Sequence, residues 1–174
     1  ICAVQGLVDD ETIRGYARTF GGVEHRIELV RTRRGVRWYN DSIASSPSRT
    51  MAGLRAFPEK VILIAGGKDK GVSYAPLGPV INDHVKAMVL CGATAGAIRR
   101  AVQEAENFRN IPILEVEDYP AAVAEADRLA QPGAAVNLSP ASTASRRPQD
   151  VGEQGRALKA LGVASPVWAA TPVN

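Results

Sequence analysis

Three polar residues, Asn40, Asp41 and Ser42, stand side by side in the segment WYNDSIASSPSRT (38–50), directly after a short apolar run. Such side chains commonly bond nearby backbone groups in turns, and the Ser-Pro pair that follows is a usual start for a helix. A turn that leads into a helix therefore accounts for much of the pattern. It does not account for three polar side chains where an apolar strand ends, which is where α/β proteins bind ligands.

The segment AGGKDKG (65–71) holds a second group of residues suited to binding. Two adjacent glycines let backbone N–H groups approach an anion closely, and Lys68 or Lys70 supplies positive charge. A carboxylate or phosphate suits this loop, and the alternative is a glycine turn with two solvated lysines. It is not a Walker-type phosphate loop, because that motif requires Gly-Lys-Ser or Gly-Lys-Thr, and neither occurs in the chain.

Other residue types that commonly carry chemistry are sparse. His25 and Arg26 stand together; a lone His is usually structural, whereas Arg26 could offer its planar fork to a carboxylate, phosphate or sugar. We expect His84 at the surface. Two His residues without a spaced acid cluster predict no metal site. Ser139 and Ser142 have no His base in a suitable pattern, so a serine nucleophile is not predicted.

A repeated order of strand, loop and helix must position these groups. Apolar runs of strand length occupy 61–65, 86–92, 111–116 and 134–139. Helices are predicted over 9–20, 95–105, 118–130 and 149–161, with a further helix beginning at 46–47. The segment 25–39 predicts a β-hairpin that turns at Arg33-Arg34-Gly35. Together the elements predict an α/β fold: a mainly parallel sheet with helices on both faces, preceded by a short hairpin.

In such a sheet the loops after the strands gather along one edge. Here those loops are 40–46, 66–73, 92–94 and 139–145, and they are rich in hydroxyls, glycines and lysines. The hairpin's second strand ends where its first strand begins. We therefore predict that Arg26 and Asp41 lie close together at the carboxyl edge of the sheet.

Composition narrows the class of protein. The chain has 174 residues, of which 45% are hydrophobic and 22% charged, and this predicts one domain with room for a small extra element. It contains no apolar run of transmembrane length and begins without the features of a signal peptide, so we expect no membrane contact. Its two cysteines, Cys2 and Cys91, lie far apart and form no metal-type pair, which favours a reducing, cytoplasmic setting. Cys91 follows an apolar run and is expected to be a small buried thiol.

Four arginines crowd the predicted hairpin, and the net charge is +3. They are Arg31, Arg33, Arg34 and Arg37. A nucleic-acid patch and a solvated hairpin are both open interpretations. The chain offers no interleaved aromatics or RNA-binding motif, so we expect no nucleic-acid partner.

Four segments in order and spacing resemble the Mur ligase family: FGGVEHRIELV, GVRWYNDSIASSPSRTMAGLRAF, KVILIAGGKDKGVSYAPL and VNLSPASTAS. The resemblance runs from the first residues to about 161. It implies that 1–24 end the family's central ATPase domain and that 25–161 form its Rossmann-like C-terminal domain. We expect 162–174 to be a disordered tail. The family's N-terminal UDP-binding domain and its phosphate loop are not in this sequence.

The resemblance also implies a reaction. ATP phosphorylates the carboxylate of UDP-N-acetylmuramoyl-L-alanine, and the amine of D-glutamate attacks the acyl phosphate to form an amide in peptidoglycan synthesis. Mg²⁺ is implied too, with its ligands in the central domain. The residues carried over for ATP are Arg26, Asn40 and Asp41. Those for D-glutamate are Ser45, Lys70 and a third hydroxyl, where the chain departs from the family pattern and offers Ala144, or Ser145 after a one-residue slip; we assign Ser145.

Alternatives remain at this stage. One is another Mur-type or folylpolyglutamate-type ligase, although the Asp-Asn-Pro-Arg motif expected of a diaminopimelate-adding relative is absent from the chain. Another is a Rossmann-like module that binds an anion without catalysis. We expect a monomer that belongs to an ATP-dependent ligase, and we expect these 174 residues alone to be inactive because they contain no phosphate loop.

Overall fold

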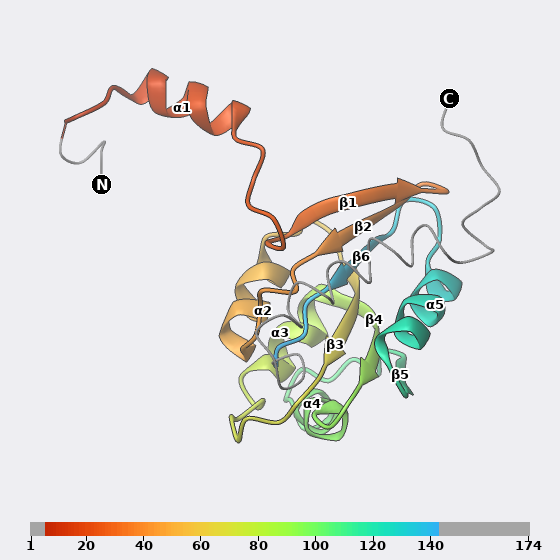
Figure 1. The fold of residues 1–174 in the computed structure, drawn as a ribbon. Helices are drawn as coiled ribbons and strands as arrows, with labels where there is room; N and C mark the ends of the chain where they lie inside the picture. Colours follow the sequence, from red (N-terminus) through yellow and green to blue (C-terminus); the bar gives the residue numbers. More distant parts are fainter. Residues whose placement is uncertain (1–5, 143–174) are drawn as a thin grey trace.

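A mixed β-sheet forms the centre of the computed structural model, which describes residues 6–142 (Figure 1). In these residues the strand order is β1-β2-β6-β3-β4-β5. β1 pairs antiparallel with β2, and every other pairing in the sheet is parallel. The strands are β1 (Glu28–Arg33), β2 (Val36–Asn40), β3 (Val61–Gly66), β4 (Val85–Cys91), β5 (Ile113–Val116) and β6 (Ala135–Leu138).

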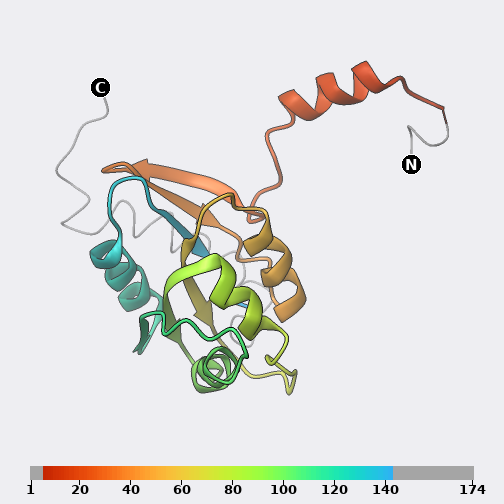
Figure 2. The same ribbon diagram turned by 180° about the vertical axis from the view of Figure 1, so that it is seen from behind.

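Helices cover both faces of this sheet. The helices are α1 (Asp10–Thr19), α2 (Pro47–Arg55), α3 (Leu77–His84), α4 (Ala95–Gln103) and α5 (Tyr119–Leu129). Leu54, Leu77 and Ile98 bring α2, α3 and α4 into one buried cluster with Leu63 of β3. Figure 2 views the sheet from this side. Val123 of α5 belongs to the cluster on the opposite face, so the expected α/β fold with two covered faces is confirmed.

Double coverage explains why the central strands are apolar without alternation. All six residues of β3 are buried, because its successive side chains alternate between the face covered by α2, α3 and α4 and the face covered by α5. Each fully buried Leu, Ile or Val side chain contributes about 1.5–3 kcal/mol relative to exposure. Cys91 at the end of β4 shares this environment, which confirms the expected buried thiol, and burial raises the pKa of this thiol to about 11.

The hairpin forms where the sequence predicts it. Arg34 and Gly35 have positive φ values of 49° and 72°, the conformation of a two-residue turn that matches strand twist. Arg33 approaches Asp127 of α5 at 3.8 Å, and Arg37 pairs with Glu59 at 2.5 Å. These acids offset part of the hairpin's positive charge, which weakens the interpretation of a nucleic-acid patch.

The structure differs from the predicted elements in three places. No element was predicted for 74–85, yet α3 occupies most of this segment and runs directly into β4. The helix expected over 95–105 ends at Gln103, and β5 is two residues shorter than predicted. The helix predicted over 149–161 and the tail predicted over 162–174 lie outside the described residues. No helix in residues 6–142 is both long and apolar enough to span a membrane.

Backbone hydrogen bonds join the loops at the carboxyl edge of the sheet in the order of their strands. Ala141 N–H donates to Ala44 O at 3.0 Å, which links the loops after β6 and β2. Gly66 N–H donates to Pro140 O at 2.9 Å, and Thr94 N–H donates to Gly67 O at 3.1 Å. The predicted gathering of these loops is therefore confirmed for the described residues.

Candidate functional site

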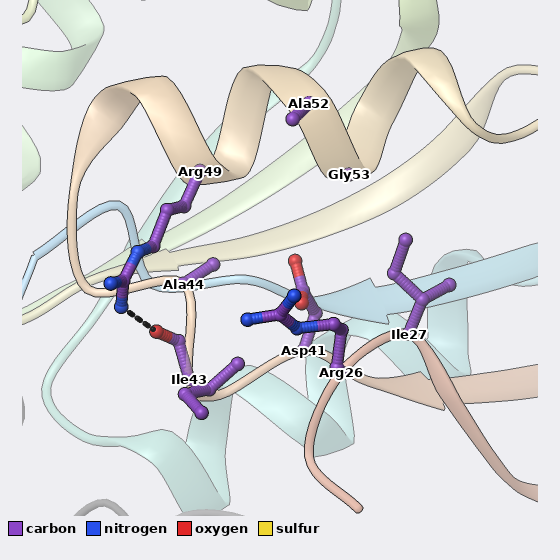
Figure 3. A pocket seen from close by; sticks show the side chains of 8 residues that line it. All are labelled: Arg26, Ile27, Asp41, Ile43, Ala44, Arg49, Ala52 and Gly53. Carbon is purple, nitrogen blue, oxygen red and sulfur yellow. Dashed lines mark hydrogen bonds between the residues drawn. The ribbon is translucent and has the colours of Figure 1, made fainter. Parts of the chain in front are cut away.

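A pocket of about 310 Å³ lies between α2 and the loop that follows β2 (Figure 3). The pocket has an apolar wall, two guanidinium groups and one carboxylate. Its lining residues are Arg26, Ile27, Asp41, Ile43, Ala44, Arg49, Ala52 and Gly53. Arg26 and Asp41 line the same pocket, which confirms the prediction that they lie together at this edge.

Asp41 is the buried polar group of the pocket, with only 4% of its surface exposed. Its backbone N–H donates to Leu138 O at 2.8 Å, so β6 fixes the chain where Asp41 leaves the sheet. Burial raises the pKa of the Asp41 carboxyl above its ordinary value. A hydrogen bond from Ser139, another from the backbone of Ile27 and the charge of Arg26 act in the opposite direction and favour the carboxylate.

Two arginines approach the pocket from different elements. Arg26 precedes β1, and Arg49 lies in the first turn of α2; both are exposed. Arg49 Nη1 donates to Ile43 O at 3.3 Å, which directs its guanidinium toward the loop (Figure 3). Guanidinium groups bind phosphate and carboxylate oxygens, and a buried carboxylate accepts hydrogen bonds from hydroxyls. The pocket is therefore suited to a ligand with both anionic groups and hydroxyls.

Asn40 lies beside the pocket but is not among its lining residues. Its Oδ1 accepts from Ser42 N–H at 3.1 Å, and its Nδ2 lies 2.8 Å from His25 Nδ1 and 3.3 Å from Glu28 Oε2. The fully buried amide thus holds the turn after β2 against the start of the hairpin. This geometry indicates that the Asn40 side chain stabilises the turn, and its contact with ATP stays a prediction.

A cluster of possible metal ligands was not foreseen from the sequence. Ligand atoms of Glu24, His25 and Glu28 all lie within 4.8 Å of one another. Because Asn40 Nδ2 is a donor, His25 Nδ1 must accept, and the ring proton then sits on Nε2. No ring lone pair remains for a metal, whereas metal-bound histidines normally donate through their second nitrogen. This cluster therefore does not suit the Mg²⁺ that the resemblance implies.

The loop that carries Lys70 differs from the pocket. Lys68 and Lys70 are exposed, and they stand on the loop after β3, separated from β2 in the sheet by β6. The base of the loop is fixed by two hydrogen bonds: Tyr119 Oη donates to Gly66 O at 2.5 Å, and Thr94 N–H donates to Gly67 O at 3.1 Å. Ser45 is half-buried in the loop after β2. The structure thus places Ser45 and Lys70 on one edge of the sheet, while Ser145 lies outside the described residues.

Sequence reasoning missed two parts of the site. Arg49 and Gly53 face the pocket from α2, and their spacing of four residues, one helical turn, was the available signal. Ser139 was considered only as a nucleophile and set aside. The structure instead places its hydroxyl 2.9 Å from Asp41 Oδ2.

Comparisons with known proteins show which family the chain belongs to. The family model described as "Mur ligase, glutamate ligase domain" matches residues 25–142. The chain is 49% identical over 164 residues to the UDP-N-acetylmuramoylalanine--D-glutamate ligase of Acetivibrio thermocellus, covering 91% of this chain and 35% of that protein. It is 46% identical over 158 residues to the ligase of the same name from Ruminiclostridium cellulolyticum, covering 88% and 34%. The chain therefore spans about a third of the length of these curated relatives.

Solved structures share the fold. A murein peptide ligase from Psychrobacter arcticus superposes with a TM-score of 0.56 at 15% identity, covering 84% of this chain and 32% of that one. The folylpolyglutamate synthase of Mycobacterium tuberculosis, solved with ADP and AMPPCP, gives a TM-score of 0.56 at 17% identity, covering 92% and 37%. From the match of the family model and the identity to these relatives, we conclude that the chain belongs to the Mur ligase family.

Proposed function

We propose that this chain is the C-terminal portion of an ATP-dependent ligase that adds D-glutamate to UDP-N-acetylmuramoyl-L-alanine during peptidoglycan synthesis. The observation that carries the proposal is the identity of 46–49% to D-glutamate ligases over most of the chain. The requirement for ATP favours the cytoplasm as the site of the reaction. Residues 1–24 would complete the central ATPase domain; the absence of any buried residue in α1 supports this division.

The pocket beneath α2 is proposed as the contact with ATP. Arg26 would bind phosphate oxygens, and Asp41 would accept hydrogen bonds from ribose hydroxyls. Support comes from the pairing of an exposed guanidinium with a buried carboxylate in one pocket of about 310 Å³. Mg²⁺ would neutralise phosphate charge, with its ligands supplied by the rest of the ligase.

The hydroxyl of Ser45 and the ammonium of Lys70 are proposed to bind the two carboxylates of D-glutamate, with Ser145 as a third contact. A dicarboxylate needs charged and hydroxyl donors to leave water. Lys70 is exposed on a loop of the same sheet edge as Ser45, so it is accessible to such a substrate. These residues bind and orient the amino acid, while the chemical step depends on the acyl phosphate formed in the central domain.

The test is a coupled assay on a complete ligase that carries residues 25–142 of this chain. Phosphate release should require ATP, UDP-N-acetylmuramoyl-L-alanine and D-glutamate together, and mass spectrometry should detect the amide product. Release that depends on diaminopimelate or on a folate acceptor would favour the alternative ligases. Nucleotide binding without any amide product would favour the non-catalytic anion-binding module.

A further inference from the structure

Three polar side chains from distant parts of the sequence meet beneath the pocket. Asp41 follows β2, Ser139 follows β6, and Thr50 lies in α2. Ser139 Oγ lies 2.9 Å from Asp41 Oδ2 and 3.0 Å from Thr50 Oγ1. Ser139 and Thr50 are fully buried. Buried polar groups are costly unless they are paired, so a contact between elements this far apart in sequence calls for an explanation.

The direction of each hydrogen bond follows from the number of protons available to donate. A serine hydroxyl has one proton, so Ser139 cannot donate to both neighbours. The Asp41 carboxylate only accepts, and a charged acceptor forms the stronger bond. Ser139 therefore donates to Asp41, and its oxygen accepts from Thr50.

Gly53 completes this arrangement from the same helix. A Cβ atom at position 53 would lie 2.7 Å from Asp41 Oδ2, closer than real Cβ contacts allow. Thr50 and Gly53 are three residues apart, so they present one face of α2 to Asp41 and Ser139. Helix α2 thus approaches the Asp41 carboxylate closely at Gly53 and supplies the Thr50 hydroxyl that bonds to Ser139.

We propose that Ser139 and Thr50 are positioning residues that hold the Asp41 carboxylate in the orientation needed to bind the nucleotide. They act through Asp41 and do not line the pocket themselves. This inference rests on the proposed function, because it takes the ligand of Asp41 to be ATP. It adds a pair of buried hydroxyls, Thr50 and Ser139, that connects α2 and the end of β6 to the carboxylate in the proposed nucleotide pocket; this pair is called the hydroxyl relay below.

The first experiment compares two substitutions of Thr50 in the complete ligase. Thr50→Val keeps the shape of the side chain and removes the hydroxyl, whereas Thr50→Ser keeps the hydroxyl and removes a buried methyl group. We expect Thr50→Val to raise the KM for ATP about threefold to tenfold and Thr50→Ser to change it less than about twofold. A purely structural role predicts that any loss follows the change in melting temperature and affects the KM for D-glutamate equally, which would overturn the proposal.

The second experiment is a double-mutant cycle on Ser139 and Asp41. Ser139→Ala should raise the KM for ATP about tenfold or more, because the bond it removes is to a charged group. In the Asp41→Asn background the same substitution should have little further effect. An equal effect in both backgrounds would show that Ser139 acts independently of Asp41 and would overturn the relay.

A binding-independent measurement separates failure of the relay from failure of the proposed function. NMR titration of the Asp41 carboxyl in the 174-residue chain should show a higher pKa in Ser139→Ala, because Arg26 and the Ile27 backbone are then the remaining groups that favour the carboxylate. If this shift occurs but Asp41→Asn leaves the KM for ATP unchanged, the hydroxyl contact stands and the assignment of ATP to the pocket is wrong. If Asp41→Asn raises that KM but Ser139→Ala changes neither quantity, the relay is wrong and the assignment stands.

Discussion

The pocket beneath α2 and the loop at 66–73 occupy the same edge of the sheet, yet they are built in opposite ways. In the pocket, Asp41 is buried between Ser139, in the loop after β6, and Gly53 of α2, and the hydrogen bond from Ser139 holds its carboxylate before any ligand arrives. In the loop, hydrogen bonds tie the base to neighbouring elements, and Lys70 is exposed. Preorganisation reduces the entropy lost on binding. We infer that the proposed nucleotide contacts are largely preformed, whereas the proposed amino-acid contacts are completed by the substrate.

The largest effect is expected at the base of the loop. Gly66 has φ of +115°, and a Cβ atom there would lie 2.0 Å from Cys91 O. Gly66→Ala should destabilise the domain by about 4 kcal/mol or more, because both the backbone conformation and the neighbouring strand forbid the methyl group. Thermal denaturation of the 174-residue chain should show a melting temperature lower by about 10 °C or more.

Gly71→Ala is the matched control at the tip of the same loop. Its φ is +69°, but nothing lies within 4 Å of the added Cβ. We expect a loss of about 1 kcal/mol from the strained φ alone. Similar losses at both positions would contradict the distinction between a fixed base and an open tip.

The next effect concerns the open part of the loop. Removing a charged donor from a desolvated carboxylate typically costs about 2–4 kcal/mol, or roughly 30-fold to 1000-fold in affinity. Lys70→Ala should therefore raise the KM for D-glutamate by about this factor, with little change in the KM for ATP. Steady-state kinetics of the complete ligase measure both. Lys68→Ala should do much less, and equal effects of the two substitutions, or an effect confined to ATP, would assign the loop to nucleotide phosphate.

A smaller effect is expected from the exposed rim of the pocket. Arg49 lines the pocket from the first turn of α2, while Arg55 lies in the last turn and is not a lining residue. Arg49→Ala should raise the KM for ATP about tenfold, because one charge-assisted bond to phosphate is lost. Arg55→Ala should leave it within about twofold, so that equal effects would point to the net charge of the helix instead of a specific contact.

The smallest effect tests the burial of Asp41. Since burial raises its pKa, ionisation of Asp41 opposes folding, and the stability present at low pH is lost as the pH rises through the raised folded-state pKa. Asp41→Asn cannot ionise. At about pH 8 it should melt a few degrees above the parent chain, and the difference should disappear near about pH 4. A lower melting temperature than the parent at high pH would show that the hydrogen bonds to the carboxylate outweigh its desolvation.

Much of the fold was predictable because its central strands are buried on both faces and appear as unbroken apolar runs, such as 61–65. α3 was missed because Pro76, Gly78 and Pro79 obscure its helical spacing of Leu77, Val80 and Ile81. Pro is tolerated in the first turn of a helix. Gly78 is required by packing, since a Cβ there would lie 1.9 Å from Ala101 O of the neighbouring helix.

The site was predictable only where local connectivity decides it. Arg26 and Asp41 stand at the two ends of one hairpin, so their proximity follows from the turn between them. Ser139 is 98 residues from Asp41, and their contact depends on β6 pairing with β2. No local sequence pattern specifies the order of the strands in the sheet, so the hydrogen-bond partner of the Asp41 side chain could not be predicted from the sequence.

The position of β6 also has a consequence for how the chain folds during synthesis. β6 is the last strand of the described residues to be made, but it pairs with both β2 and β3 in the middle of the sheet. Until Leu138 has left the ribosome, the hairpin has no parallel partner and the edges of β2 and β3 remain open. Such late, long-range pairing slows folding and exposes strands that can aggregate. Chaperone binding to the nascent chain would therefore be most useful in the interval between completion of β5 and arrival of β6.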